Sequence, residues 1–524
     1  MTDTLSLQRR ALMKAATFML LIVLCAGCMG VYVFSDPDLH RAIELSRITY
    51  QVNHLYAGDL DWTQMTNLGI DAMFERLDRY SAYVEPRQFD RLDEEMTGSY
   101  SGIGVSVIEN HNGLLIMSVR ENGPAASVGL MTGDLITGAD SVSFKGLAIE
   151  EATQFLRGPE DSRVVLGVFR AATDDSLRVE VTRRKIDFLH IPFAGFTPDS
   201  LIYIRLLDFD AGASDDVEAA LDSLMQHPSI PPRGVILDMR GNPGGLFVEA
   251  YRTANLFLDE GKFIVGTRGR SRWSNERHES SGKDHTGGLP MAVIVDRGSA
   301  SSTEIVSGAL RQLGRAILVG DTTFGKGLVQ GFTRFTDGSG IRLTISRYYL
   351  EGNLFLNSFD STLNDTGTGL VPDYFVRAPE SRGFPLALES SLLLNSFAGQ
   401  HQDEIVAASE QFALDDSWVA RYADYARSQG FQYRSTVTDI ADVVYELASL
   451  DVDLPEARRV AERILRTARD DDDRQMQEYG WYIKSRLKEL AYERKYGSYR
   501  AYAEVIVKDH PIINRAAELL REQR

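Results

Sequence analysis

The sequence predicts an α/β protein of several domains, in which an α/β (α+β) domain carries an inserted β domain and a helical C-terminal extension. The 524-residue chain is too long for a single hydrophobic core. Short strands separated by glycine turns fill residues 98–185, whereas strands and helices alternate over 186–380. From residue 385 to the end the apolar residues recur at helical spacing.

The N-terminal region predicts a membrane segment. Residues 15–34 are uncharged and long enough to span a bilayer. Arg9, Arg10 and Lys14 precede them, which places residues 1–14 in the cytoplasm and the body outside. We expect a single-pass inner-membrane protein whose body lies in the periplasm or extracytoplasmic space. The segment is either an uncleaved transmembrane anchor or a processed signal of the lipoprotein, twin-arginine or ordinary secretory kind.

Composition narrows the function classes. The net charge of −18 argues against a nucleic-acid-binding surface. Both cysteines lie within residues 15–34, so the body has no cysteine nucleophile and no thiolate metal site. The histidines are scattered and no His-Glu-x-x-His pair occurs. We expect no metal and no cofactor.

Element by element, residues 36–97 read as amphipathic helices and residues 150–156 as a helix within the β domain. Residues 186–380 are predicted to hold buried strands and covering helices in alternation. The strands are expected at 201–206, 234–238, 291–295, 316–320 and 341–346, and the helices at 215–225, 246–258 and 302–313.

Two short motifs carry the candidate chemistry. Ser301 ends Gly-Ser-Ala-Ser, and Lys326 stands between two glycines in Phe-Gly-Lys-Gly. A serine hydroxyl needs a base to become a nucleophile, and a lysine can be that base once desolvation removes its charge. Ser299 is the rival nucleophile, and Ser301 could instead be a plain helix N-cap. Glu304 is expected either to make a polar contact near the site or to cap the helix start.

The order of motifs identifies a family. The chain resembles the carboxyl-terminal processing peptidases, or tail-specific proteases, over about residues 40–380. The resemblance lies in the order of its parts: a membrane segment, a helical prefix, the β domain, Asp-Met-Arg-Gly-Asn-Pro-Gly-Gly and the two motifs above. The β domain resembles a PDZ domain. The resemblance implies a catalytic fold of the ClpP/crotonase-like type, with Ser301 as nucleophile and Lys326 as general base. It also implies that Gln330 orients the lysine amine.

The oxyanion hole is expected at the start of the helix that follows Ser301. The Ser302 N–H would be one donor, because it lies at the positive end of the helix dipole. The second donor would come from the Pro-Gly-Gly turn, from Gly244 in preference to Gly245. Asp238 and Arg240 are expected to shape this turn rather than to do chemistry.

The PDZ-like domain suggests how substrate is bound. The segment Gly102, Ile103, Gly104 and Val105 resembles a carboxylate-binding loop, whose N–H groups capture a peptide C-terminus beside a strand edge. Ile103 and Val105 would line the pocket for the last side chain. The alternative is a tight strand entry without a ligand role. Arg157 either couples this domain to the protease domain or is a surface residue.

These features predict a membrane-anchored serine endopeptidase that recognises unstructured protein C-termini through its PDZ domain and cleaves through a Ser–Lys acyl-enzyme. Its role would be processing of a specific precursor or general degradation of envelope proteins. Two other readings are a PDZ adaptor with an idle protease domain and a non-proteolytic hydrolase. Residues 385–524 would pack on the catalytic domain, form a homo-oligomer or bind an adaptor protein.

The predicted parts are 1–14 (cytoplasmic), 15–34 (membrane segment), 36–97 (helical part of the protease core), 98–185 (PDZ), 186–380 (catalytic) and 385–524 (helical extension).

Overall fold

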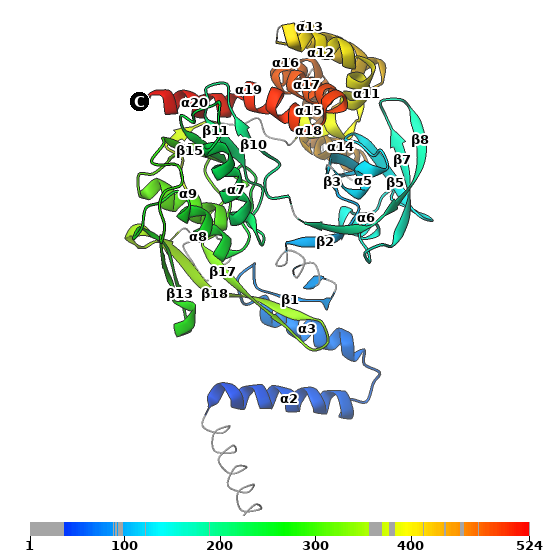
Figure 1. Ribbon diagram of the computed structural model, residues 1–524. Helices are drawn as coiled ribbons and strands as arrows, with labels where there is room; N and C mark the ends of the chain where they lie inside the picture. The colour runs from blue at the N-terminus through cyan, green and yellow to red at the C-terminus, as the bar shows by residue number, and fades with distance from the viewer. Residues whose placement is uncertain are drawn as a thin grey trace, which may run out of the picture. The chain divides into compact units, whose positions relative to one another are not determined.

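The computed structural model describes residues 36–522 with gaps at 87, 90–91, 93–97, 121, 188, 356–368, 377–382, 412, 434–435, 451–454 and 470. The chain divides into two compact units, Met1–Tyr83 and Val84–Arg524, whose elements are labelled in Figure 1. The predicted segments 1–14 and 15–34 lie outside the described residues. Within the described part, no helix has the length and apolar character needed to cross a membrane.

The described part of the first unit begins with two helices, as predicted. They are α2 (Pro37–Leu55) and α3 (Trp62–Phe74), and strand β1 (Ala82–Val84) follows. Each helix starts at an aspartate whose side chain accepts backbone N–H groups of the first turn, Asp36 for α2 and Asp61 for α3. Neither helix buries a residue.

The PDZ-like region is an antiparallel β domain with two short helices. Its main sheet has the strand order β3-β4-β5-β7-β8, so β3 lies at one end, while β2 pairs with β9. The turn between β3 and β4 requires Gly113, since its φ is +151° and an added Cβ would lie 2.1 Å from the Ile136 carbonyl oxygen. The elements are β2 (Ser99–Gly102), β3 (Val105–Asn110), β4 (Gly113–Val119), α5 (Pro124–Ser127), β5 (Asp134–Ala139), β6 (Val142–Ser143), α6 (Ile149–Leu156), β7 (Arg163–Arg170), β8 (Asp175–Thr182) and β9 (Arg184–Asp187).

The catalytic region contains a sheet in the order β10-β11-β12-β15-β16-β20. All neighbours are parallel except β10 and β11. A parallel sheet is buried on both faces, which explains the continuous apolar runs in its central strands. The strands are β10 (Phe193–Phe196), β11 (Ile202–Arg205), β12 (Val235–Asp238), β15 (Met291–Val295), β16 (Ile317–Gly320) and β20 (Tyr374–Phe375).

Alternate residues of these strands pack into two different cores. On one face, Ile204, Leu237 and Val293 lie in a core shared with α7 (Ala213–Met225), α8 (Phe247–Asn255) and α9 (Ser302–Gln312). On the other, Tyr203, Ile236 and Ile294 lie in a core shared with α20 (Pro511–Glu522). The strands expected at 201–206, 234–238, 291–295 and 316–320 and the three expected helices are confirmed, and the α/β class with them. The strand expected at 341–346 lies instead in the second sheet and is only partly buried. The ClpP/crotonase-like type stays a prediction.

A second sheet is antiparallel. Strand β18 pairs with β13, β17 and β19, and β13 pairs in turn with β14. The long β17–β18 hairpin matters for the site, because its first strand follows Lys326 directly. The elements are β13 (Phe263–Gly269), a 3₁₀ turn (Arg272–Ser274), β14 (Arg277–Glu279), β17 (Leu328–Arg334), β18 (Gly340–Leu350), a 3₁₀ turn (Glu351–Asn353) and β19 (Leu354–Phe355).

The C-terminal region is helical in its described part, as predicted. Helices α10–α13 and α16–α18 share one apolar core, whereas α20 packs on the catalytic sheet (Figure 1). The elements are α10 (Phe384–Ser390), α11 (Leu393–Gln400), α12 (Gln402–Gln411), α13 (Asp416–Ser428), α14 (Thr436–Leu450), α15 (Pro455–Arg469), α16 (Asp471–Glu478), α17 (Gly480–Tyr496), α18 (Ser498–Ala501), a π-helical turn (Tyr502–Ile506), α19 (Val507–Asp509) and α20.

Candidate active site

Ser301 stands at the junction between a tight turn and helix α9. Its φ is +55°, a region that costs a non-glycine residue about 1–3 kcal/mol and is often found at functional sites. The rival Ser299 is fully buried, and its hydroxyl donates to the Met239 carbonyl oxygen at 2.8 Å. Ser299 therefore has a structural role, and Ser301, at the start of α9, is the better candidate nucleophile.

One carboxylate brings the serine and lysine segments together. Glu304 lies in the first turn of α9 and is fully buried. Its Oε2 accepts the backbone N–H of Ser301 at 2.8 Å and that of Lys326 at 2.8 Å. Its Oε1 accepts the Gly325 N–H at 2.7 Å and the Thr323 hydroxyl. Burial raises the pKa of Glu304, and these hydrogen bonds oppose that rise. Glu304 therefore has both expected roles: it caps the start of α9 and makes polar contacts at the site.

The lysine side chain is oriented by the strand that follows it. Lys326 is half-buried, and its Nζ donates to Oε1 of Gln330 on β17 at 3.3 Å. Lys326 lies two residues before β17 begins at Leu328, and its side chain reaches the glutamine that the family resemblance implies. A carboxamide oxygen can accept this bond whether the amine is charged or neutral.

The glycine turn lies directly against the serine. Gly244 has φ +102°, and an added Cβ would be 2.8 Å from the Ser301 Cβ and 2.9 Å from the Ser302 nitrogen. The Ser302 N–H opens α9 and has no partner within the helix. However, the Gly244 N–H donates to Oδ1 of Asn242 at 2.9 Å. This differs from the expected free donor: in this conformation the Asn242 side chain closes a local turn on that N–H, and Gly245 is the other candidate.

A buried charged cluster sets the start of this turn. Asp238 ends β12 with no exposed surface. Its carboxylate binds the Arg240 guanidinium through Nε at 3.0 Å and Nη2 at 2.6 Å, and accepts the Tyr203 hydroxyl at 2.7 Å. Burial opposes ionisation, yet the charges of Arg240 and Arg205 outweigh it and hold the pKa of Asp238 well below its usual range. Asp238 and Arg240 shape the turn, as expected.

Tyr348 and Asn242 hold the site and are absent from the sequence-based prediction. The Tyr348 hydroxyl lies 2.7 Å from the Lys326 carbonyl oxygen and 3.2 Å from that of Ser301. Burial raises the pKa of Tyr348, which keeps this hydroxyl a donor. A buried tyrosine on β18 must find a hydrogen-bond partner, but the sequence gives no sign of which one. For Asn242, the Asn-Pro-Gly turn was the available signal.

The predicted peptide-binding loop lies where β2 leads into β3. Gly104 has φ +78°, and Ile103 is buried in the core of the domain rather than open to a pocket. The carbonyl oxygens of Ile103 and Gly104 accept the Ala125 and Arg120 N–H groups. Val105 begins β3 and is half-buried. The carbonyl groups of Ile103 and Gly104 thus fix the loop to the segment 120–125 of the same domain.

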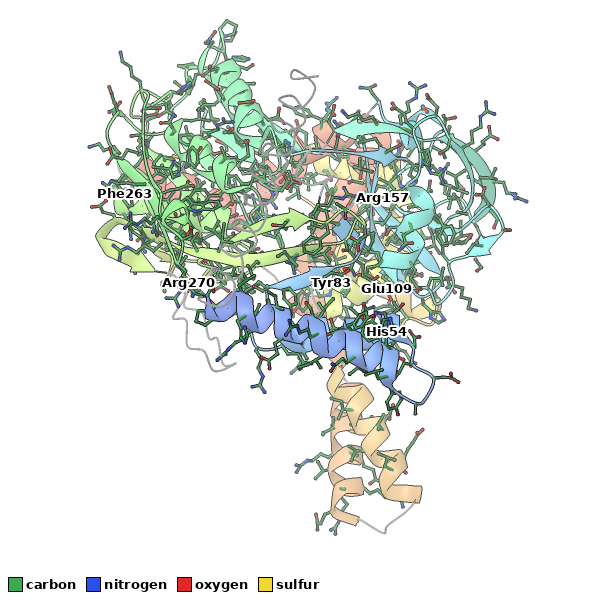
Figure 2. The ribbon with its side chains drawn as sticks, turned by 90° about the horizontal axis from the view of Figure 1, so that it is seen from below. His54, Tyr83, Glu109, Arg157, Phe263 and Arg270 are labelled. Atoms are coloured by element: carbon green, nitrogen blue, oxygen red, sulfur yellow. The ribbon has the colours of Figure 1, made fainter. Side chains whose placement is uncertain are left out.

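Arg157 lies within the PDZ-like domain. It follows the last residue of α6 and is labelled in Figure 2. Its guanidinium carbon lies 5.0 Å from the centre of the Tyr100 ring on β2, a cation–π distance. Arg157 therefore links α6 to the strand that enters the predicted carboxylate loop, and its coupling role stays a proposal.

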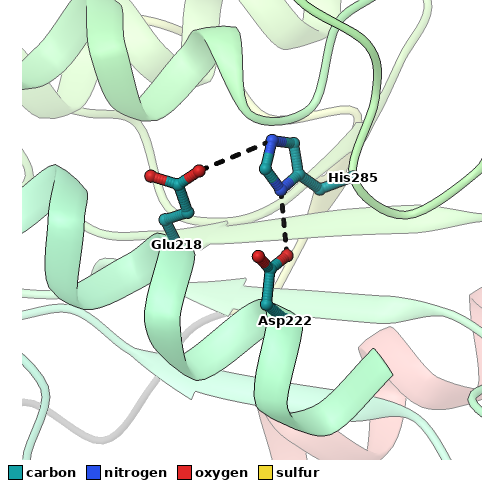
Figure 3. Close-up of side chains that lie close together, drawn as sticks. All are labelled: Glu218, Asp222 and His285. Carbon is teal, nitrogen blue, oxygen red and sulfur yellow. Dashed lines mark hydrogen bonds and ion pairs between the residues drawn. The ribbon is translucent and has the colours of Figure 1, made fainter. Parts of the chain in front are cut away.

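A histidine with two carboxylates lies elsewhere on the catalytic domain. His285 Nδ1 is 2.9 Å from Asp222 Oδ1, and its Nε2 is 3.8 Å from Glu218 Oε1 (Figure 3). Both carboxylates are on α7. Because the two ring nitrogens face different carboxylates, the imidazole bridges them and ties its loop to α7.

Comparisons with known proteins match two regions of the chain. The family described as "Peptidase family S41" matches residues 200–359, and "PDZ domain" matches residues 101–181. A carboxy-terminal-processing protease of Bartonella bacilliformis is 29% identical over 352 residues, which cover 66% of this chain and 78% of that protein. A carboxyl-terminal-processing protease of Synechocystis is 34% identical over 322 residues, covering 60% of this chain and 71% of that protein.

Among solved structures, the photosystem II D1 C-terminal processing protease is 25% identical with a TM-score of 0.38, over 62% of this chain and 84% of that one. The sequence relationship to the Synechocystis protein, together with the two family matches, settles membership. The chain belongs to the carboxyl-terminal-processing proteases of peptidase family S41, and it is a serine-type peptidase with a PDZ domain.

Proposed function

We propose that this chain is a Ser–Lys endopeptidase that binds protein C-termini through its PDZ domain and acts outside the cytoplasm from a membrane anchor. One observation carries the dyad: a single carboxylate oxygen of Glu304 accepts the backbone N–H of both Ser301 and Lys326. A second link supports it, since the Phe324 N–H donates to the Ser299 carbonyl oxygen at 2.9 Å.

In the proposed reaction, neutral Lys326 takes the proton of the Ser301 hydroxyl as its oxygen attacks the scissile carbonyl. The oxyanion is stabilised by the Ser302 N–H and by Gly244, whose bond to Asn242 must open, or by Gly245. Lysine then returns the proton to the leaving amine, which leaves an acyl-enzyme. Water, deprotonated by the same lysine, attacks the ester carbonyl, and the lysine returns that proton to the Ser301 oxygen as the acyl C–O bond breaks.

The close contact at Gly244 gives a sharp test of the oxyanion turn. We expect Gly244→Ala to lower kcat by about 100-fold, because the added Cβ would lie 2.8 Å from the Ser301 Cβ. Gly241→Ala is the matched control, since Gly241 also has positive φ (+66°) but an added Cβ would meet nothing within 4 Å. It should lower the melting temperature with a much smaller loss of kcat. Equal kcat losses in steady-state assays with a peptide substrate would contradict this role.

The PDZ proposal rests on β3, which ends the strand order of its sheet beside the 102–105 loop. A peptide can extend a sheet at such an edge while backbone N–H groups hold its carboxylate. We expect a peptide with a free, apolar C-terminus to bind the Ser301→Ala protein at least about 10-fold more tightly than its C-terminal amide. Fluorescence anisotropy measures both, and equal affinities would argue against carboxylate capture.

The cellular role can be tested by mapping protein C-termini. Mass spectrometry of envelope proteins, with and without Ser301→Ala, should show C-termini that depend on Ser301. One altered protein would indicate processing of a specific precursor, and many would indicate general degradation. An unchanged set of C-termini with an unchanged phenotype would favour the adaptor function. Protease accessibility of the chain in spheroplasts tests its extracytoplasmic location.

A further inference from the structure

A segment near the C-terminus contacts the charged cluster of Asp238 and Arg240 that precedes the glycine turn. His510 lies just before α20, and its Nε2 is 2.8 Å from Nη1 of Arg240. A guanidinium has no acceptor, so Arg240 donates and the imidazole presents a lone pair at Nε2. Burial and then the charge of Arg240 lower the pKa of His510 to about 3, consistent with a neutral ring. The side chain of Arg240 is thus shared between Asp238 and His510.

A second residue of the same segment reaches the cluster through Tyr203. The Tyr502 hydroxyl lies 3.3 Å from that of Tyr203, which in turn donates to Asp238. The Tyr502 ring stacks on Phe193 of β10, with centroids 5.1 Å apart and planes at 17°. Tyr502 therefore contacts the cluster at a different point from His510.

Helix α20 fixes the position of His510. Ile512, Ile513 and Ala516 are buried in the core that also contains Ile236 and Ile294 of the catalytic sheet. Because His510 immediately precedes Pro511, the first residue of this helix, docking of α20 determines where the imidazole lies. The residue that contacts Arg240 is therefore adjacent in sequence to the helix that packs on the catalytic sheet.

The cluster is continuous with the active-site turn. Arg205 donates from Nη1 to the Asp238 carbonyl at 3.1 Å and from Nη2 to the Arg240 carbonyl. The next residue, Gly241, donates its N–H to Asp296 Oδ1 at 2.7 Å. Arg240 is thus held by its side chain and its backbone at the point where the turn that contains Gly244 begins.

We propose that His510, supported by Tyr502, is a positioning residue for the glycine turn, so that the C-terminal segment 499–522 is an integral part of the catalytic site. His510 Nε2 accepts from Nη1 of Arg240, while Nε and Nη2 of the same guanidinium bind Asp238. The inference rests on the proposed oxyanion role of the turn. It makes the catalytic competence of the protease depend on a segment that lies about 270 residues beyond the turn along the chain.

The test compares two substitutions of His510 with a packing control in a different core, all in the full-length protein. His510→Leu removes the acceptor and His510→Gln retains one. Ile405→Val makes a small cavity in the separate core of the C-terminal helices, which includes no residue of α20 or of the cluster. We expect His510→Leu to lower kcat about 10- to 100-fold with little change in KM. His510→Gln should recover kcat to within about 3-fold, and Ile405→Val should lower the melting temperature while retaining wild-type kcat.

A readout without catalysis separates this inference from the proposed function. Hydrogen exchange of the 240–246 peptide should accelerate in His510→Leu, and not in Ile405→Val, whether or not the protein cleaves substrate. Wild-type exchange in His510→Leu, wild-type kcat in that variant, or equal effects of all three substitutions would each overturn the inference. Failure of Ser301-dependent cleavage together with accelerated exchange would overturn the proposed function alone.

Discussion

We expect Ser301→Ala to lower kcat/KM for a peptide substrate by at least about 10⁴-fold, to the level that the binding site and oxyanion donors alone provide. The structure gives the reason: Ser301 is set at positive φ against Gly244 and beside the backbone of Lys326. The fold should be retained, because the Ser301 backbone N–H still donates to Glu304. Steady-state kinetics and a thermal melt of the same sample measure both.

The lysine should be equally necessary and should act as a unit with the serine. Lys326→Ala is expected to match Ser301→Ala, and the double variant should lose no further activity. Lys326→Arg should also be inactive, because a guanidinium stays protonated and cannot accept the hydroxyl proton. Ser299→Ala is the control for the rival nucleophile: it removes a buried hydrogen bond and should lower stability by about 1 kcal/mol while retaining cleavage. Activity in Ser301→Ala with none in Ser299→Ala would reverse the assignment.

Local patterns predicted the catalytic sheet well. The strand expected at 234–238 is β12, Val235–Asp238, and the helix expected at 302–313 is α9, Ser302–Gln312. In both cases the sequence signal lies within the element or next to it. The strand is an apolar run that ends in aspartate, and the helix has a serine and a glutamate at its start. Such signals do not depend on the rest of the chain.

Features that depend on distant contacts were not predictable in the same way. The donors to Glu304 from Gly325 and Lys326 lie 21 and 22 residues away, and His510 lies 270 residues from Arg240. Helical periodicity identifies α20 but not the sheet face that it covers. The hydrogen bond from Gly244 to Asn242 has a different cause: an asparagine side chain competes locally for the N–H that the reaction would need.

The second large effect is expected at Glu304. Its two oxygens accept four donors, and one of these oxygens accepts the backbone N–H of both Ser301 and Lys326, whose carbonyl oxygens the Tyr348 hydroxyl contacts. In Glu304→Gln, one oxygen becomes an NH₂ group that faces two donors. The variant should therefore lose two hydrogen bonds and leave two buried donors unsatisfied, which costs about 2–4 kcal/mol in the free energy of unfolding.

Activity should fall further than stability, because the two motifs are no longer tied to a common acceptor. We expect kcat of Glu304→Gln to fall by about 100-fold or more at a temperature where the protein stays folded. Thr323→Val is the graded control, since it removes one donor and leaves the acceptor and the Ser301 and Lys326 bonds in place. It should lower stability by about 1 kcal/mol and kcat by less than about 10-fold. If the two variants lose kcat equally, Glu304 acts only through stability, and the contact between the two motifs must be set by Tyr348 or by the β17–β18 hairpin instead.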